Sequence, residues 1–290
     1  MKIIYLVLII CALIAPLSAE QDIEVLNAGV VETTNDAKIH YFSQGETIVI
    51  RDKDRNCSSI RAFGSKYDQG DWNEASLLFI GVGADQESGD YLITAEDCGN
   101  PKQDILLRVK VLETAYPKTR VSRYTAPPNP RVDRQQMAVT LAFIKGQILK
   151  DSTLGQSYVQ PLANLDVIDP FGLIYENNPY RRHQGVDLKV PVGSPVRAAN
   201  RGAVALVAKN YRAEGNMLII NHGAGIFSVY MHLSRINVKD GQIVERGQIV
   251  ALSGRTGAGV REPHLHFNIR LHNAYVDPLN FIETANKYLQ

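Results

Sequence analysis

Short runs rich in β-branched and aromatic residues, each closed by glycine, asparagine, aspartate or serine, recur along both halves of this chain. The first half contains KIHYF, ETIVIRD, DYLITAED and DILLRVKVLE, and the second contains NMLIINHG, FSVYMHL and HLHFNIRL. Runs this short favour strands over helices, and turn residues at regular intervals are typical of antiparallel sheets. The pattern therefore predicts a mainly β protein.

A proline-rich segment, AYPKTRVSRYTAPPNPRVDR, separates the two halves. Such composition favours an extended, semi-rigid linker. Apolar residues at helical spacing follow it and predict one helix, namely Met137, Leu141, Ile144 and Ile148. We expect an Ig-like β-sandwich accessory domain over residues 20–115, the linker and helix over residues 116–150, and a second antiparallel β domain over residues 151–290.

The first residues, MKIIYLVLIICALIAPLSAEQ, place one lysine before an apolar run that ends at the small pair Ser18-Ala19. This layout is typical of a secretory signal peptide over residues 1–19, cut after Ala19. The apolar run is shorter than the ~20 residues that a membrane-spanning helix needs. We therefore expect an exported protein, periplasmic or extracellular, that meets the membrane only during export.

Removal of the signal peptide would leave two cysteines, Cys57 and Cys98. In an oxidising compartment an even pair is first interpreted as a disulfide, the alternative being two free buried thiols. The loop between them is 41 residues long (98 minus 57), so the bond would contribute roughly 4 kcal/mol in the chain-entropy account.

Charge argues against nucleic acid as a partner, because 31 basic residues balance 30 acidic ones. Histidine usage is uneven instead: six of the seven histidines follow the linker, which indicates that chemistry is concentrated in the second domain. His222 follows an apolar strand at a turn and is expected to have a structural or surface role. His272 is expected to be a solvated hairpin residue. The sequence does not set the oligomeric state.

A metal site is indicated by His183 and Asp187, which lie four residues apart in RRHQGVDL. A fully extended segment would hold them about 13 Å apart, but Gly185 allows a bend that brings both to one ion. Histidine and aspartate are ordinary zinc donors, and a catalytic zinc takes three protein ligands and leaves a fourth position open. The residues alone leave the third ligand open among His222, His232, His264 and His266.

His264 and His266 flank one leucine in PHLHF. Residues two apart in a strand point to the same face, so the two imidazoles stand side by side. Such a pair is either two solvated histidines or one metal ligand beside a histidine that acts on whatever the metal holds.

From about Asp169 to Pro278 the chain resembles the LytM-type, lysostaphin-like zinc endopeptidases that cut peptidoglycan peptides. Six motifs carry the resemblance in order before a final Asp-Pro pair: HQGVDL, GSPVRAANRGAV, GNMLIINHG, YMHLS, VKDGQIVERGQIVALSGRTG and PHLHF. The preceding β domain, linker and helix also resemble the N-terminal region of two-domain members.

The resemblance implies a zinc ion held by His183, Asp187 and His266. It places His264 at the position of the general base or of the group that orients the attacking water. It places His232 at the other catalytic histidine, which stabilises developing charge. Relatives often have a glutamate where this chain has Asn268, and Val260, Arg261 and Glu262 also depart from the usual pattern, which bears on substrate preference.

The function expected from these residues is that of an exported zinc endopeptidase acting on peptidoglycan peptides. The alternative is a non-catalytic envelope factor that binds or regulates wall hydrolases, as in relatives that have lost zinc ligands. The presence of all five positions favours the enzyme. A secreted protease acting on proteins or on the walls of rival cells is a third possibility, and the accessory domain or linker is a candidate autoinhibitor.

Overall fold

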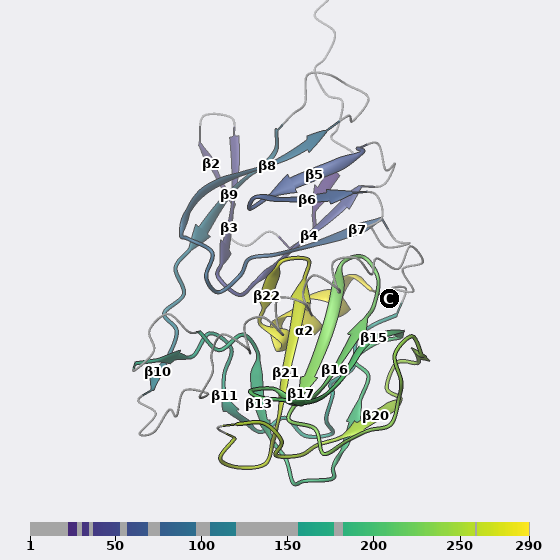
Figure 1. Ribbon diagram of the computed structural model, residues 1–290. Helices are drawn as coiled ribbons and strands as arrows, with labels where there is room; N and C mark the ends of the chain where they lie inside the picture. Colours follow the sequence, from purple (N-terminus) through teal and green to yellow (C-terminus); the bar gives the residue numbers. More distant parts are fainter. Residues whose placement is uncertain are drawn as a thin grey trace, which may run out of the picture.

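The computed structural model describes residues 23–27, 31–34, 37–52, 57–68, 76–96, 105–119, 156–176, 182–258 and 260–289. The expected signal peptide, the linker helix and Cys98 lie outside these residues. Cys57 is buried and disulfide-bonded. Because Cys98 is not among the described residues, the pairing of the two cysteines stays a prediction. Strands make up most of the described chain, which confirms the mainly β class (Figure 1). Among the described residues, no helix is both long and apolar enough to span a bilayer.

The N-terminal domain consists of two packed sheets. The smaller sheet has the order β1 (Ile23–Val25), β4 (Thr47–Asp52) and β7 (Leu77–Gly81). The larger has the order β2 (Val31–Thr34), β3 (Ala37–Ser43), β9 (Ile105–Leu112), β8 (Gly89–Glu96), β5 (Ser59–Ala62) and β6 (Ser65–Asp68).

Among the described strands of the N-terminal domain, one pair departs from the expected antiparallel arrangement. β3 and β9 pair in parallel, with Ile39 opposite Arg108 and Ser43 opposite Leu112. The two strands are far apart in the chain, so a long connection rather than a hairpin joins them, and it allows either direction. The Ig-like topology stays a prediction.

The small sheet is buried on both faces. Ile48, Ile50 and Ile80 pack with the large sheet in one apolar cluster. Val49 and Phe79, on the opposite face, belong to the core of the C-terminal domain. A strand covered on both sides must be apolar at every position, which explains the unbroken runs TIVI and LLFIG.

The C-terminal domain is built on one antiparallel sheet, as expected. Its order is β11 (Val167–Asp169), β13 (Val186–Lys189), β21 (His264–Leu271), β17 (Ile226–Met231), β16 (Gly215–Asn221), β15 (Gly202–Tyr211) and β19 (Ile243–Val244), with β22 (Ala274–Val276) also on β21. A second sheet has the order β14 (Pro195–Arg197), β20 (Ile249–Leu252) and β18 (Arg235–Ile236). β10 (Lys118–Thr119) pairs in parallel with β12 (Ile174–Tyr175).

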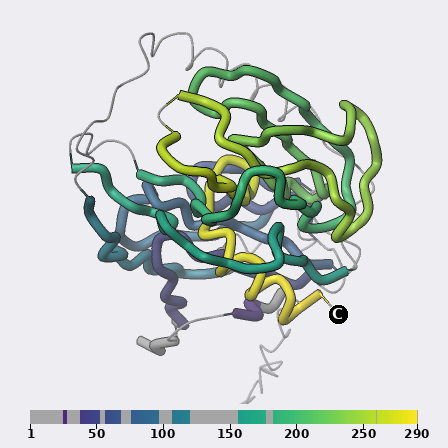
Figure 2. Tube along the Cα trace, turned by 90° about the horizontal axis from the view of Figure 1, so that it is seen from below, coloured from purple at the N-terminus to yellow at the C-terminus, as the bar shows by residue number. Residues whose placement is uncertain are grey.

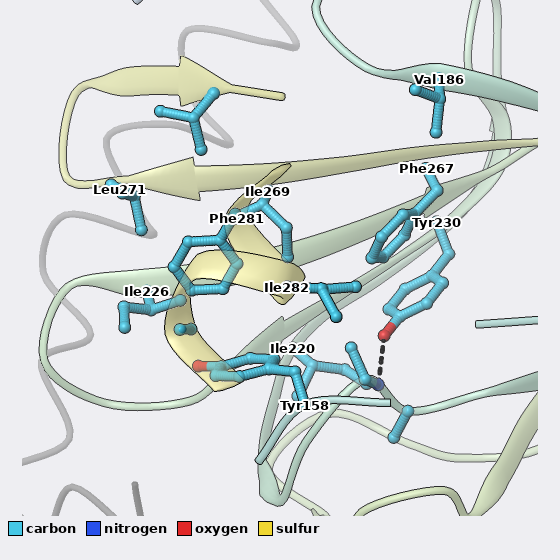
Figure 3. Packing of buried hydrophobic residues seen from close by; sticks show 14 of the residues in the cluster. Tyr158, Val186, Ile220, Ile226, Tyr230, Phe267, Ile269, Leu271, Phe281 and Ile282 are labelled. Atoms are coloured by element: carbon cyan, nitrogen blue, oxygen red, sulfur yellow. Dashed lines mark hydrogen bonds between the residues drawn. The ribbon is translucent and has the colours of Figure 1, made fainter. Parts of the chain in front are cut away.

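The C-terminal helix α2 (Pro278–Tyr288) was not predicted. Asp277 caps it by accepting hydrogen bonds from the backbone N–H groups of Leu279 and Asn280, and Pro278 opens its first turn. Figure 3 shows Phe281 and Ile282 of this helix packed with Tyr158, Ile226 and other core residues. The helix therefore closes one side of the C-terminal core.

The two domains share a continuous apolar junction. The rings of Phe79 and Phe281 lie 6.0 Å apart, edge to face. The Tyr288 hydroxyl donates a 2.7 Å hydrogen bond to the Leu26 carbonyl, which agrees with the position of the yellow helix beside the purple N-terminal segment (Figure 2). His272 packs edge to face on Tyr67 at 4.5 Å, so its expected solvated position is wrong.

Candidate metal centre

Three side chains from the two neighbouring strands β13 and β21 and the segment before β13 converge on one point. The antiparallel register places Asp187 directly opposite His266. His266 Nδ1 lies 2.7 Å from Asp187 Oδ1, and His183 Nε2 lies 3.1 Å from the same oxygen and 3.0 Å from His266 Nδ1. Among the described residues this is the one group of histidine, cysteine or acidic side chains close enough to share an ion.

Gly185 makes this close approach possible. A Cβ atom there would lie 2.5 Å from the Phe267 carbonyl oxygen and 2.9 Å from His266 Nε2. Any larger residue would push β21 away from the segment that carries His183. Glycine is therefore needed at this position because the two backbone segments approach each other closely.

Hydrogen bonds fix which ring nitrogen of each histidine faces the cluster. His183 Nδ1 lies 2.9 Å from the Pro170 carbonyl, so it carries the ring proton and leaves Nε2 as the donor atom for a metal. His266 presents Nδ1 to Asp187, and a metal bound at this Nδ1 would leave the ring proton on Nε2.

Asn268 lies beside that second nitrogen, with its side-chain amide 3.3 Å from His266 Nε2. The amide nitrogen cannot accept a hydrogen bond from an N–H group, whereas Oδ1 can. With a metal on Nδ1, turning the amide over would place Oδ1 at Nε2–H and give a partner to an oxygen that is otherwise buried without one. Asn268 would thereby hold a metal-bound His266 in the tautomer that leaves Nδ1 to the ion.

The electrostatics favour a cation between these groups. Burial raises the pKa of Asp187, but hydrogen bonds from His183 and His266 outweigh it, and the net pKa lies well below its usual range. Burial lowers the pKa of His266, although Asp187 opposes the shift. The donor set is therefore an ionised carboxylate beside imidazole nitrogens, the combination that zinc accepts.

His264 and His232 flank this cluster. Along β21, His264 and His266 share a face while Leu265, fully buried, points to the core. His264 Nε2 lies 3.6 Å from Asp187 Oδ2, and its ring centre lies 4.8 Å from that of His232. The two imidazoles thus stand next to one another at the edge of the candidate site.

Both flanking histidines are anchored through Nδ1. That atom lies 2.9 Å from the Glu262 carbonyl in His264 and 2.9 Å from the Thr256 carbonyl in His232. Each Nε2 is thereby left free to exchange protons. His232 adopts a left-handed backbone with φ 63°, and burial, followed by the neighbouring His266 and His264, lowers its pKa to about 3.

His222, one candidate for the third ligand, lies elsewhere. It is fully buried, with Nδ1 2.9 Å from the Arg201 carbonyl and Nε2 2.8 Å from Ser228 Oγ. Burial lowers its pKa to about 4. Its role is structural, in the core and not at the surface.

A cluster of two histidines and one aspartate, flanked by two further histidines on a β-sheet, defines a metallopeptidase-type site. Residues 181–278 match peptidase family M23, so this part of the chain is an M23 peptidase domain. The match confirms the expected resemblance.

Three relatives illustrate the likeness. Peptidoglycan DD-endopeptidase ShyB of Vibrio cholerae is 43% identical over 97 residues, 33% of this chain and 22% of that protein. DD-carboxypeptidase/endopeptidase Mpg of Neisseria meningitidis is 31% identical over 139 residues, 47% of this chain and 31% of that protein. A crystal structure of a putative peptidase M23 from Pseudomonas aeruginosa has a TM-score of 0.56 and 25% identity, covering 83% of this chain and 94% of the other.

The extent of these matches differs. The chain spans about a fifth of the length of ShyB, and the match covers a third of this chain. The likeness to the Pseudomonas structure extends over both domains described above.

Proposed function

We propose that this protein is a zinc-dependent endopeptidase that hydrolyses peptide bonds of peptidoglycan. The observation that carries the proposal is the convergence of His183, Asp187 and His266 within hydrogen-bonding distance of one another, with His232 and His264 beside them. The match of residues 181–278 to peptidase family M23 and the names of relatives such as ShyB support the substrate class.

The donor set fits zinc, because two imidazole nitrogens and one carboxylate oxygen are typical ligands of a catalytic ion. When bound, zinc would polarise the scissile carbonyl and make a water molecule acidic near neutral pH. Pro170 and Asn268 would hold the two histidine ligands in the required tautomers.

The flanking histidines would move the protons. We assign His264 Nε2 to accept the proton of the attacking water as its oxygen bonds to the carbonyl carbon. The same nitrogen would return that proton to the leaving amine as the C–N bond breaks. We assign His232 to the charge that develops on the carbonyl oxygen, a role that requires a proton on Nε2 in addition to the one that Nδ1 donates to the Thr256 carbonyl.

Export completes the proposal. The expected signal peptide over residues 1–19 would deliver the chain to the compartment where peptidoglycan lies, either periplasmic or extracellular. We propose the β domain over residues 20–115 as an accessory domain and residues 151–290 as the peptidase domain, joined by the linker and helix over residues 116–150.

The deciding experiment is digestion of purified peptidoglycan by the full chain, with mass spectrometry of the released fragments. Cleavage should require zinc, stop with a chelator and fall by at least about 100-fold in His264→Ala. Glu283→Gln is the matched control, because Glu283 is 72% exposed on α2 and lies outside the site. Retained zinc binding without cleavage would favour the alternative, a non-catalytic factor that binds wall hydrolases.

A further inference from the structure

Arg270 is a buried cation without a counter-ion among the residues that the structure describes. Its side chain is 4% exposed, and Nε and Nη1 are fully buried without a hydrogen-bond partner. Within the part of the chain that the structure describes, no carboxylate forms an ion pair with it. Folded proteins rarely leave a buried guanidinium unpaired, because neither water nor an anion then offsets the loss of its hydration.

The neighbours of Arg270 do not replace that anion. Tyr275, opposite Arg270 on β22, lies under the guanidinium at 5.8 Å from its carbon to the ring centre. Phe227 lies opposite it on β17. A tyrosine face attracts a cation only weakly and accepts none of its N–H groups in a normal hydrogen bond. Burial accordingly lowers the pKa of Arg270 from its ordinary value.

The position of Arg270 relates it to the metal centre. His264, His266, Asn268 and Arg270 alternate with core residues along β21 and so occupy one face of the sheet. Arg270 lies four residues beyond His266, or about 13 Å along the strand at ~3.3 Å per residue. An extended peptide lying along this face covers that distance with about four residues.

Asn268 stands between them on the same face. It is 2% exposed, and with its oxygen turned to a metal-bound His266 its amide N–H groups would be left as donors. A glutamate two residues from Arg270 on one face could pair with the guanidinium, whereas asparagine cannot neutralise it.

We propose that Arg270, with Asn268 beside it, forms a subsite that binds a free carboxylate of the peptide substrate on the metal-centre face of the sheet. The inference rests on the proposed function, and it deepens it by naming the substrate chemistry. A carboxylate accepts two parallel N–H bonds from a guanidinium, which supplies both the missing charge and the missing hydrogen bonds. The free carboxylates of peptidoglycan stem peptides have this chemistry.

The test compares two probes that differ only in charge: a cross-linked stem-peptide dimer with free carboxylates and the same dimer with those carboxylates amidated. Binding is measured by titration calorimetry on the full, zinc-loaded chain carrying His264→Ala, which prevents turnover. The free dimer should bind about tenfold or more tightly than the amidated one. Arg270→Met and, separately, Asn268→Glu should each remove this preference.

Thermal unfolding without peptide separates a binding role from a structural one. Removal of an unpaired buried charge should leave the melting temperature of Arg270→Met equal or higher, whereas loss of a structural contact would lower it. Asn268→Glu, which keeps the arginine, guards against misfolding of the methionine variant. Equal binding of the two dimers by the parent would overturn the proposal, as would a tenfold preference that survives both substitutions.

The two proposals fail in different ways. A parent that cleaves peptidoglycan with zinc but binds both dimers equally refutes the subsite alone. A parent that prefers the free dimer but cleaves nothing refutes the endopeptidase while the carboxylate subsite stands.

Discussion

The ring and the backbone of His183 are both hydrogen-bonded to a single loop that begins at Pro170. The ring Nδ1 lies 2.9 Å from the Pro170 carbonyl, and the His183 carbonyl accepts a 2.8 Å bond from the Gly172 N–H. Tyr116, at the exit of the N-terminal domain, packs on this loop with its ring 6.2 Å from that of Phe171. The candidate metal ligand is thus supported by a contact from the other domain.

Gly172→Ala should weaken this support. Gly172 has φ 77°, and a Cβ atom there would collide with the Tyr116 ring. Gly193→Ala is the matched control, since Gly193 has φ 88° but open space around it. We expect a loss of about 1–2 kcal/mol for the control from its backbone alone, and a further 1–3 kcal/mol for Gly172→Ala. If Gly172→Ala and Gly193→Ala lose the same free energy of unfolding in urea, the Tyr116 ring moves aside without an energetic cost.

Asn268→Leu should reduce zinc affinity. The substitution removes the acceptor for His266 Nε2–H, and loss of such a partner typically costs 10–100-fold in metal affinity. Asn268→Asp retains an acceptor at the same place and should bind zinc at least as tightly as the parent. Competition against a chromophoric chelator gives both affinities. Equal zinc affinities of Asn268→Leu and the parent would mean that His266 does not need Asn268 to fix its tautomer.

The β class and the grouping of histidines could be predicted from the sequence because both depend on local pattern. Strand alternation alone places His264 and His266 on one face, and the structure agrees. The third member of the cluster required the register of β13 against β21, which sets Asp187 opposite His266. That pairing joins segments far apart in the chain, and local pattern carries no information about it.

The junction between domains was missed for a related reason. ETIVIRD is predicted above only as one strand of a sandwich, although its unbroken apolar run TIVI is the pattern of a strand covered on both faces. The helix α2 had a recognisable start in Asp277-Pro278, an N-cap followed by proline. The prediction that His272 lies in a hairpin is confirmed, but its burial depends on Tyr67 of the other domain, which the local sequence does not reveal.

Stability should fall as the pH drops from 6.5 towards 4. Burial, followed by the nearby Arg270, lowers the pKa of His272 to about 4, so the unfolded chain binds a proton that the folded chain does not. Below about pH 4 both states are protonated and this dependence ends. His272→Asn tolerates the left-handed φ of 49° and removes the titrating group.

The comparison of the two proteins isolates this residue, because other histidines titrate equally in both. The free energy of unfolding of the parent should fall more steeply between pH 6.5 and 4 than that of His272→Asn. Loss of the Tyr67 contact adds a constant offset at every pH and does not change the slope. Parallel curves from urea titrations across this range would contradict the assignment.

The shared core predicts that the two domains unfold together. Phe79 is fully buried and contacts Phe281 across the junction, so Phe79→Ala should cost about 3–5 kcal/mol and uncouple the domains. Phe42→Ala is the matched control, because Phe42 is equally buried but belongs to the sandwich cluster alone. Hydrogen exchange with peptide-level mass spectrometry should show one common opening free energy in the parent and in Phe42→Ala. Phe79→Ala should show two, with the N-terminal domain and α2 exchanging independently, and a single value in that variant would mean that the remaining junction contacts suffice.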